Sequence, residues 1–224
     1  MYHYAQYAWI TRFNPEKRIF VGKSYHFMKR VMDLSLTILT MPFWLPLLLL
    51  IALAIKISAP KDPVLFTQMR TGKGGRRFKM LKFRTMVPNA EQLKSQLAQV
   101  NANGELTGPL KLKNDPRVTK IGRFLRKTSM DELPQLINVL KGEMSLVGPR
   151  PTSWSANTYK LWQTERLDVM PGIVGLWQVY GRGSENFDEW LRMDIAYIER
   201  RSIWLDFCLL VMAVFVVFRQ KGAR

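Results

Sequence analysis

The feature that most constrains the fold is an uncharged apolar segment at residues 34–55, with the sequence LSLTILTMPFWLPLLLLIALAI. A helix rises about 1.5 Å per residue, so this segment is long enough to reach across a hydrocarbon core of roughly 30 Å. A cleavable signal peptide fits it poorly, because the run begins late, is long and has no small-x-small cleavage site after it. The segment therefore predicts a helix that enters a membrane.

Two features of this segment disfavour a simple crossing. Basic residues flank it on both sides: Arg12, Lys17, Arg18, Lys23, Lys29 and Arg30 before it, and Lys56, Lys61, Arg70, Lys73, Arg76 and Arg77 after it. Both ends are therefore predicted to be cytoplasmic. Pro42 and Pro46, about one turn apart, each remove a helical N–H and crowd the preceding turn. A helix broken at these prolines can re-enter the leaflet it left, whereas a kinked transmembrane helix is the alternative, and the symmetric charge favours the re-entrant form.

Composition narrows the chemistry. The chain has 34 Lys and Arg against 17 Asp and Glu, a net charge of +17 that indicates a polyanionic partner. The histidines, His3 and His26, both lie in the basic N-terminal stretch, which argues against Ser-His hydrolysis and His-ligated zinc. The single cysteine, Cys208, excludes an internal disulfide. Carboxylates, Lys, Arg and a hard metal ion remain as the groups that could perform catalysis.

A second apolar run covers residues 207–218. It is shorter than the roughly 17–25 residues needed to cross a bilayer, so it is predicted to pack or to lie at the membrane interface. Trp204 before it and the basic residues after it suit an element at the level of the lipid headgroups.

The intervening sequence has the pattern of a mixed soluble domain. Residues 64–70 and 78–84 are β-favouring and flank the Gly-rich TGKGG stretch, which predicts a hairpin; no helix pattern follows these glycines, as a phosphate-binding loop would require. Lys82 and Arg84 should share one face of the second strand. A helix is expected over residues 90–100, with Asn89 as its cap.

The most informative acidic residues are Asp131 and Glu132, which are adjacent in a basic neighbourhood. Ser129 and Glu132 fit a capping box, and Gly142 provides a helix stop. Pro134 moves the predicted helix start towards Asp131. Both carboxylates would then lie at a helix N-terminus, where a bound phosphate is also stabilised. Helix capping is the favoured interpretation, and a metal-phosphate site is the alternative suggested by the nearby Arg123, Arg126 and Lys127.

Two arginines lie in stiff loops. Arg150 stands between Pro149 and Pro151, so its guanidinium is either a fork for phosphate or an exposed turn residue. Arg182 follows a segment with several glycines, which on its own is weak evidence for a binding site. Farther along, Asp194 falls on the apolar face of a predicted helix over residues 184–199, so we expect it to be buried and paired with an arginine, Arg182 being the leading candidate.

Several motifs in a fixed order, from about residue 29 to residue 219, resemble the monotopic bacterial phosphoglycosyl transferases, also called bacterial sugar transferases. They are Lys29-Arg30-x-x-Asp33, KFRTM at 82–86, TSMDELPQ at 128–135, NVLKG at 138–142, MSLVGPRP at 144–151, PGIVGLWQV at 171–179 and Gly181-Arg182. Their combined order and spacing make the resemblance highly specific.

The resemblance implies transfer of a sugar-1-phosphate, with a hexose expected, from a UDP-sugar to undecaprenyl phosphate. The family does this with Mg²⁺ among the phospholipids of the cytoplasmic face of the bacterial inner membrane, as the first membrane step of exopolysaccharide, O-antigen or glycoprotein glycan synthesis. Asp131 would attack the β-phosphate with release of UMP, and the polyprenyl phosphate would then take the phosphosugar from the aspartyl intermediate. Glu132 and the metal would neutralise charge and manage the proton, with Asp131 and Glu132 as metal ligands. The residues expected to contact phosphate are Lys82, Arg84, Arg126, Arg150 and Arg182.

Two departures from the family pattern stand out. The family often has Ser-Pro at the break in the membrane helix, whereas this chain has Leu45-Pro46; Thr40 or Pro42 is expected to compensate. Larger relatives carry an N-terminal multi-helix membrane module, so the chain is predicted to be a minimal member or a shortened one. The sequence leaves open whether it forms a homo-oligomer.

The predicted fold is α/β: an irregular α+β catalytic domain with an N-terminal re-entrant membrane helix and interfacial helices. Its parts are a basic N-terminal segment (1–33), the re-entrant helix (34–58) and a membrane-associated catalytic domain (59–224) that ends in an apolar helix. The rival hypothesis is a non-catalytic, basic, membrane-anchored module that binds nucleic acid or acidic lipid. The enzyme hypothesis expects no nucleic-acid partner.

Overall fold

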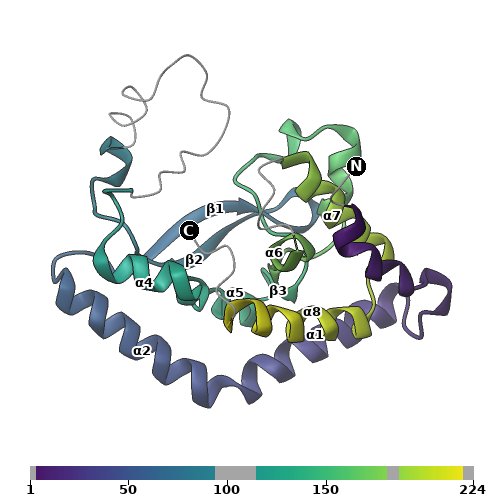
Figure 1. Cartoon of the computed structure of the whole chain (residues 1–224), viewed down its shortest axis with the longest axis horizontal. Coiled ribbons are helices and arrows are strands. Elements are labelled where there is room, and N and C mark those ends of the chain that lie inside the picture. The colour runs from purple at the N-terminus through teal and green to yellow at the C-terminus, as the bar shows by residue number, and fades with distance from the viewer. Residues whose placement is uncertain (1–3, 94–114, 181–186, 219–224) are drawn as a thin grey trace.

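The computed structural model describes residues 4–93, 115–180 and 187–218 (Figure 1). A mixed helical and stranded fold is confirmed. The helices are α1 (Gly22–Leu39), α2 (Met41–Ser58), α4 (Lys120–Thr128), α5 (Gln135–Lys141), α6 (Leu176–Tyr180), α7 (Phe187–Arg200) and α8 (Ile203–Phe218). The strands are β1 (Leu65–Thr71), β2 (Arg77–Phe83), β3 (Ser145–Val147) and β4 (Gly172–Val174). Short 3-10 turns are η1 (Tyr4–Arg12), η2 (Pro15–Lys17), η3 (Lys73–Gly75), η4 (Met130–Glu132), η5 (Ala156–Thr158) and η6 (Leu161–Leu167).

The two long N-terminal helices meet at an angle and run along one side of the molecule, with the strands on the other side of them (Figure 1). The break between α1 and α2 lies at Thr40, and Pro42 follows in the first turn of α2. Pro46 lies inside α2. The predicted break at Pro46 is therefore wrong, whereas Pro42 does adjoin the break, because Pro42 cannot donate to the carbonyl of Ile38 one turn earlier.

Side chains satisfy the carbonyls next to this break. The Thr40 hydroxyl donates to the carbonyl of Leu36 over 2.7 Å, and the same carbonyl also accepts the Thr40 N–H. The indole Nε1 of Trp44 donates to the carbonyl of Thr37 over 2.9 Å, a contact that the sequence did not predict. The bend is thus built into the hydrogen bonding of the two helices.

Two small sheets carry the remaining backbone pairing. Strands β1 and β2 form the predicted antiparallel hairpin, in which Phe66 pairs with Lys82 and Arg70 with Phe78. Its Gly-rich connection is the turn η3, as expected. Strands β3 and β4 pair in parallel, with Ser145 opposite Gly172. Residues 90–93 are helical as predicted, and the rest of the expected helix lies outside the described residues.

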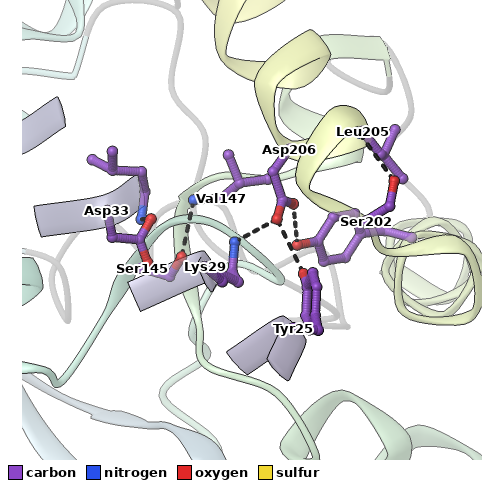
Figure 2. Close-up of polar contacts among 10 residues, drawn as sticks. Tyr25, Lys29, Asp33, Ser145, Val147, Ser202, Leu205 and Asp206 are labelled. Atoms are coloured by element: carbon purple, nitrogen blue, oxygen red, sulfur yellow. Dashed lines mark hydrogen bonds and ion pairs between the residues drawn. The ribbon is translucent and has the colours of Figure 1, made fainter. Parts of the chain in front are cut away.

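The motif Lys29-Arg30-x-x-Asp33 docks α1 onto the domain (Figure 2). Lys29 Nζ lies 2.9 Å from Asp206 Oδ2 of α8, and both side chains are buried. Arg30 donates to the carbonyls of residues 139 and 140 at the end of α5. Asp33 accepts the backbone N–H of Leu146 of β3 over 3.1 Å. These contacts fix the helix that leads into α2 against three elements of the domain.

The main core joins both ends of the chain. Ile10 of η1 is buried in the same hydrophobic cluster as Val147, Tyr197 and Leu209. The N-terminal segment is therefore packed onto the rest of the molecule. Helix α8 buries Leu209 in this cluster and leaves an opposite face exposed, so the second apolar run packs, as predicted, and also presents an apolar surface.

Helix α7 buries the predicted acid. Asp194 is buried and pairs with an arginine, which confirms that part of the prediction. Among the described residues the partner is Arg166 of η6, whose Nη2 lies 2.7 Å from Asp194 Oδ2, a residue that the sequence did not predict. Arg182 itself lies outside the described residues.

Candidate active site

The acidic pair lies in the short turn η4 between α4 and α5. Ser129 adopts the left-handed conformation, with φ 58°, and ends α4. Its side chain makes no capping hydrogen bond, so the predicted capping box is not formed. Helix α5 begins only at Gln135, after Pro134, because proline suits the start of a helix and not its interior. The two carboxylates therefore belong to a tight connection and do not cap a helix.

Glu132 is held by two cations from different elements. Lys82 Nζ of β2 lies 2.9 Å from Glu132 Oε1. The Arg150 guanidinium binds the same carboxylate through both nitrogens: Nη1 lies 3.0 Å from Oε2, and Nη2 contacts Oε1. The fork that the sequence assigned to phosphate thus holds a carboxylate in this structure, in the bidentate geometry that arginine favours.

These contacts keep Glu132 ionised. Burial alone would raise the pKa of this carboxyl, but the charges of Arg150 and Lys82 and their hydrogen bonds outweigh burial and lower the pKa of Glu132. Burial also lowers the pKa of Lys82, and the charge of Glu132 opposes that shift. The low pKa of Glu132 argues against the predicted role in managing a proton.

Asp131 differs from its neighbour. Its carboxylate makes no hydrogen bond or ion pair with any residue in the described ranges. Burial and the adjacent charge of Glu132 raise the pKa of Asp131, while Lys82, Arg150 and Arg126 act against that shift. Asp131 is therefore the open carboxylate of the pair, close to cations yet not bound by them.

Arg126 reaches the site from α4. Its Nε donates to the hydroxyl of Thr85 over 2.9 Å. At this point α4 approaches the chain after β2 closely. A Cβ at Gly122 would lie only 2.1 Å from the carbonyl oxygen of Thr85, so the approach requires glycine. Burial lowers the pKa of Arg126, while Asp131 raises it. Arg126 thus lies close enough to Asp131 for the two charges to interact.

The other predicted cations are placed differently. Arg84 follows the end of β2, and its Nε donates to the carbonyl of Pro63 over 2.9 Å. No contact joins it to Asp131 or Glu132 within the described part of the chain, so the structure does not bring it to the pair. The structure brings together Lys82, Arg126 and Arg150 around the acids.

The sequence prediction missed Arg70 of β1. Burial and repulsion from Arg150 lower the pKa of Arg70 to about 10. Its Nε is buried and has no hydrogen-bond partner among the described residues. The hairpin register could have indicated it: Arg70 lies on the same sheet face as Phe66, which pairs with Lys82. Arg70 therefore adds an unsatisfied donor near Arg150.

The strands fix the loop that carries Arg150. Gly148 donates its N–H to the carbonyl of Val174, and Gly172 donates to the carbonyl of Pro149 over 2.9 Å. A Cβ at Gly172 would lie 2.0 Å from the nitrogen of Gly148, so only glycine allows this approach. The PGI stretch of β4 thus positions the neighbouring GPRP loop.

The acidic pair fits a magnesium ion only in part. Magnesium prefers oxygen ligands and is commonly held by one or two carboxylates together with phosphates of a substrate. Within residues 4–93, 115–180 and 187–218 no cluster of three or more acidic, His or Cys side chains could hold an ion without such help. Asp131 offers open oxygens, whereas both oxygens of Glu132 are already paired. The protein would therefore supply Asp131 to an ion that the ligand's phosphates also bind.

Comparison with known proteins identifies the family of the chain. A family model described as bacterial sugar transferase matches residues 24–220. The chain is 40% identical over 204 residues to the undecaprenyl-phosphate galactose phosphotransferase of Salmonella typhimurium, which covers 90% of this chain and 42% of that protein. It is 40% identical over 206 residues to the UDP-glucose:undecaprenyl-phosphate glucose-1-phosphate transferase of Escherichia coli K12, covering 88% and 41%.

A third relative matches end to end. The exopolysaccharide production protein ExoY of Rhizobium meliloti is 34% identical over 214 residues, which cover 94% of each chain. By contrast, the chain spans about two fifths of the length of the Salmonella and Escherichia proteins. The family match covers nearly all of the described fold, including every motif around Asp131 and Glu132. The chain therefore belongs to the bacterial sugar transferase family.

Proposed function

We propose that this chain transfers a sugar-1-phosphate from a UDP-sugar to undecaprenyl phosphate and releases UMP. The observation that carries the proposal is the open carboxylate of Asp131 beside a carboxylate, Glu132, that is locked by Lys82 and Arg150. Two relatives are named for the transfer of a sugar phosphate to undecaprenyl phosphate, one with galactose and one with glucose. A hexose is the expected sugar for the same reason.

In the proposed first step, a carboxylate oxygen of Asp131 attacks the β-phosphorus of the UDP-sugar. The bond from that phosphorus to the bridging oxygen breaks, and UMP leaves with the electron pair. The phosphosugar is now an acyl phosphate on Asp131. No proton need be transferred, because the nucleophile is already ionised and the leaving oxygen belongs to a phosphate.

In the second step, a phosphate oxygen of undecaprenyl phosphate attacks the same phosphorus. The acyl phosphate bond breaks, and the Asp131 carboxylate is regenerated. Splitting the transfer in this way requires only one phosphate-binding site, which the two substrates occupy in turn. The positive side chains of Arg70 and Arg126 would stabilise the charge that develops on the transferred phosphoryl group.

Magnesium, when bound by Asp131 and the diphosphate, would neutralise charge on the leaving UMP. Glu132 has a different role in this scheme: it fixes Lys82 and Arg150 at the site and balances their charge. Lys82 and Arg150 can then reach a phosphate without being drawn onto Asp131. The charge balance of the cluster, rather than proton transfer, would be the contribution of Glu132.

The apolar helix supports a site that lies next to lipid. Helix α2 is, in the described ranges, the one helix long and apolar enough to cross a membrane by length and composition. Met130 and Leu133, which flank the acidic pair, pack against the hydrophobic cluster to which Ile51 and Ile55 of this helix belong. The bend at Thr40 and the basic flanks support a re-entrant α1–α2 unit at the cytoplasmic face of the inner membrane. A polyprenyl phosphate in that leaflet would present its phosphate near Asp131.

A panel of UDP-sugars tests the proposal. Protein in a nanodisc is mixed with undecaprenyl phosphate, magnesium and one UDP-sugar at a time, and UMP release is measured. We expect release with UDP-glucose or UDP-galactose, and loss of it in Asp131→Asn. If no UDP-sugar gives UMP, and the protein instead binds nucleic acid with a steep dependence on salt, the rival hypothesis of a basic binding module is correct.

A further inference from the structure

The buried pair of Arg166 and Asp194 lies outside the machinery described so far. Arg166 is 7% exposed and Asp194 1% exposed, so both charges are removed from water. Arg166 Nη2 donates to Asp194 Oδ2 over 2.7 Å and also to the backbone carbonyl of Arg150 over 2.6 Å. One nitrogen of Arg166 thus binds both Asp194 and the backbone of Arg150, the residue whose guanidinium binds Glu132.

Stability alone explains this pair poorly. Replacing a buried ion pair by apolar side chains of similar volume is often neutral or stabilising. Here the cost is higher still, because Arg166 Nη1 is buried without a hydrogen-bond partner among the described residues. What an apolar pair could not supply is the hydrogen bond to the carbonyl of Arg150.

The carbonyl of Arg150 lies in a loop whose backbone is held from two sides. Pro149, the residue before it, is tied to β4 by the N–H of Gly172. Arg166 then holds the next carbonyl, so two successive peptide groups of the loop are fixed from different elements. The Arg150 guanidinium extends from this backbone to both oxygens of Glu132. A shift of the loop would move that guanidinium relative to Asp131.

We propose that Arg166 and Asp194 are positioning residues for the acidic pair. Asp194 fixes the guanidinium of Arg166, Arg166 fixes the carbonyl of Arg150, and Arg150 in turn holds Glu132 beside Asp131. The expected effect on rate rests on the proposed function, whereas the expected effect on the Arg150 side chain does not.

Side-chain NMR tests the positioning directly. The variant Arg166→Met with Asp194→Leu removes both charges together and keeps the volume filled. In protein labelled with ¹⁵N-arginine, the guanidinium signal of Arg150 is identified by its absence in Arg150→Lys. We expect its N–H exchange with solvent to be at least about 10-fold faster in the double variant than in the wild type. Unchanged exchange would overturn the proposal.

Kinetics provide the second readout. In the double variant, kcat for UMP release should fall by about 100-fold while KM changes little, because the loss is one of positioning. In an Arg150→Lys background the same double change should have almost no further effect, since it acts through Arg150. An equal loss in both backgrounds would contradict the proposal.

A control separates positioning from general loosening of the fold. Leu209→Ala opens a cavity in the main core and leaves both Arg166 and Asp194 in place, and it should lower the melting temperature without the drop in kcat. If Leu209→Ala lowers kcat as much as the double variant, the effect is general and the inference fails. If the wild type releases no UMP, the proposed function fails, and the exchange of Arg150 still decides the positioning.

Discussion

Asp131 and Glu132 are adjacent acids with opposite environments. Lys82 and Arg150 lower the pKa of Glu132 in spite of its burial, while burial and the charge of Glu132 raise the pKa of Asp131. Environments that separate two pKa values in this way commonly divide the roles of paired carboxylates. Asp131 is thereby left as the group able to react, and Glu132 as the fixed counter-ion.

The corresponding amide variants should behave differently. Asp131→Asn should abolish UMP release, because an amide is not a competent nucleophile. Glu132→Gln should lower kcat by about 10²–10³-fold, because Lys82 and Arg150 lose the charge that arranges them. Both should keep a cooperative thermal transition. If both amides retain full activity in the UMP assay, the two acids have only a structural role.

The pH dependence of the rate follows from Asp131. The nucleophile must be ionised, so activity falls as pH drops through its pKa, and a raised pKa moves that fall above the ordinary value for aspartate. Arg126 opposes the shift. Arg126→Gln should therefore move the acid limb of kcat/KM to higher pH. Movement to lower pH would contradict the assignment of this limb to Asp131.

Asp194→Asn tests the buried pair by stability. The change leaves the Arg166 charge buried without its partner, which should lower the free energy of unfolding by about 3–5 kcal/mol. Urea denaturation of detergent-solubilised protein gives this value. Glu199→Gln, an exposed acid on the same helix with a surface ion pair to Arg200, is the matched control and should change stability little. An unchanged stability in Asp194→Asn would show that the pair is not buried as described.

At the scale of single residues, sequence patterns predict which side chains are buried or functional better than they predict which residues those side chains contact. Helical periodicity placed Asp194 on a buried face, but its partner Arg166 comes from a 3-10 turn with no repeating pattern. The sequence singled out the arginine between two prolines, yet its contact with Glu132 joins the loop after β3 to η4. Long-range side-chain pairing needs the tertiary arrangement, which local spacing does not contain.

At the scale of elements, the bend between α1 and α2 shows how competing helix signals are resolved. Two prolines one turn apart both predict a break, and the structure has it next to Pro42, where the side chains of Thr40 and Trp44 donate to backbone carbonyls at the end of α1. Pro46 is accommodated inside α2. The helix signals around the acids compete in the same way. Ser129 and Glu132 predict a capping box, but Pro134 moves the start of α5 beyond the acids.

Topology should therefore depend more on Pro42 than on Pro46. Single cysteines at Lys23 and Lys61, in a Cys208→Ser background, are probed in intact cells with an impermeant thiol reagent. In the wild type neither should label from outside, because a re-entrant unit keeps both ends in the cytoplasm. Pro42→Ala restores an N–H at the break and should give labelling at one end in part of the population.

Pro46→Ala is the matched control and should have the smaller effect. Labelling of one cysteine from outside in the wild type would instead show that the unit spans the membrane. Labelling of both variants to the same extent would show that the bend at Thr40 does not determine topology.

At the scale of the whole molecule, the exposed apolar helices and the acidic pair belong to one packed structure. Helices α1, α2 and α8 lie along one side, and each exposes large apolar side chains, such as Phe27, Leu50 and Phe215 (Figure 1). The residues that flank the acidic pair pack against a hydrophobic cluster that includes residues of α2. The order of motifs along the sequence predicted the family and the acids, whereas the docking of both chain ends into one core emerged only from the fold.

The central claim is that Asp131 carries the phosphosugar between the two substrates. The most direct measurement is made without the lipid acceptor: protein and magnesium are incubated with a UDP-sugar labelled in the β-phosphate, and label retained by denatured protein is counted against UMP released. We predict up to one label and one UMP per active site, neither in Asp131→Asn, and loss of the label when undecaprenyl phosphate is added. Release of UMP only in the presence of undecaprenyl phosphate, with no label ever trapped on the protein, would contradict the claim and indicate direct transfer within a ternary complex.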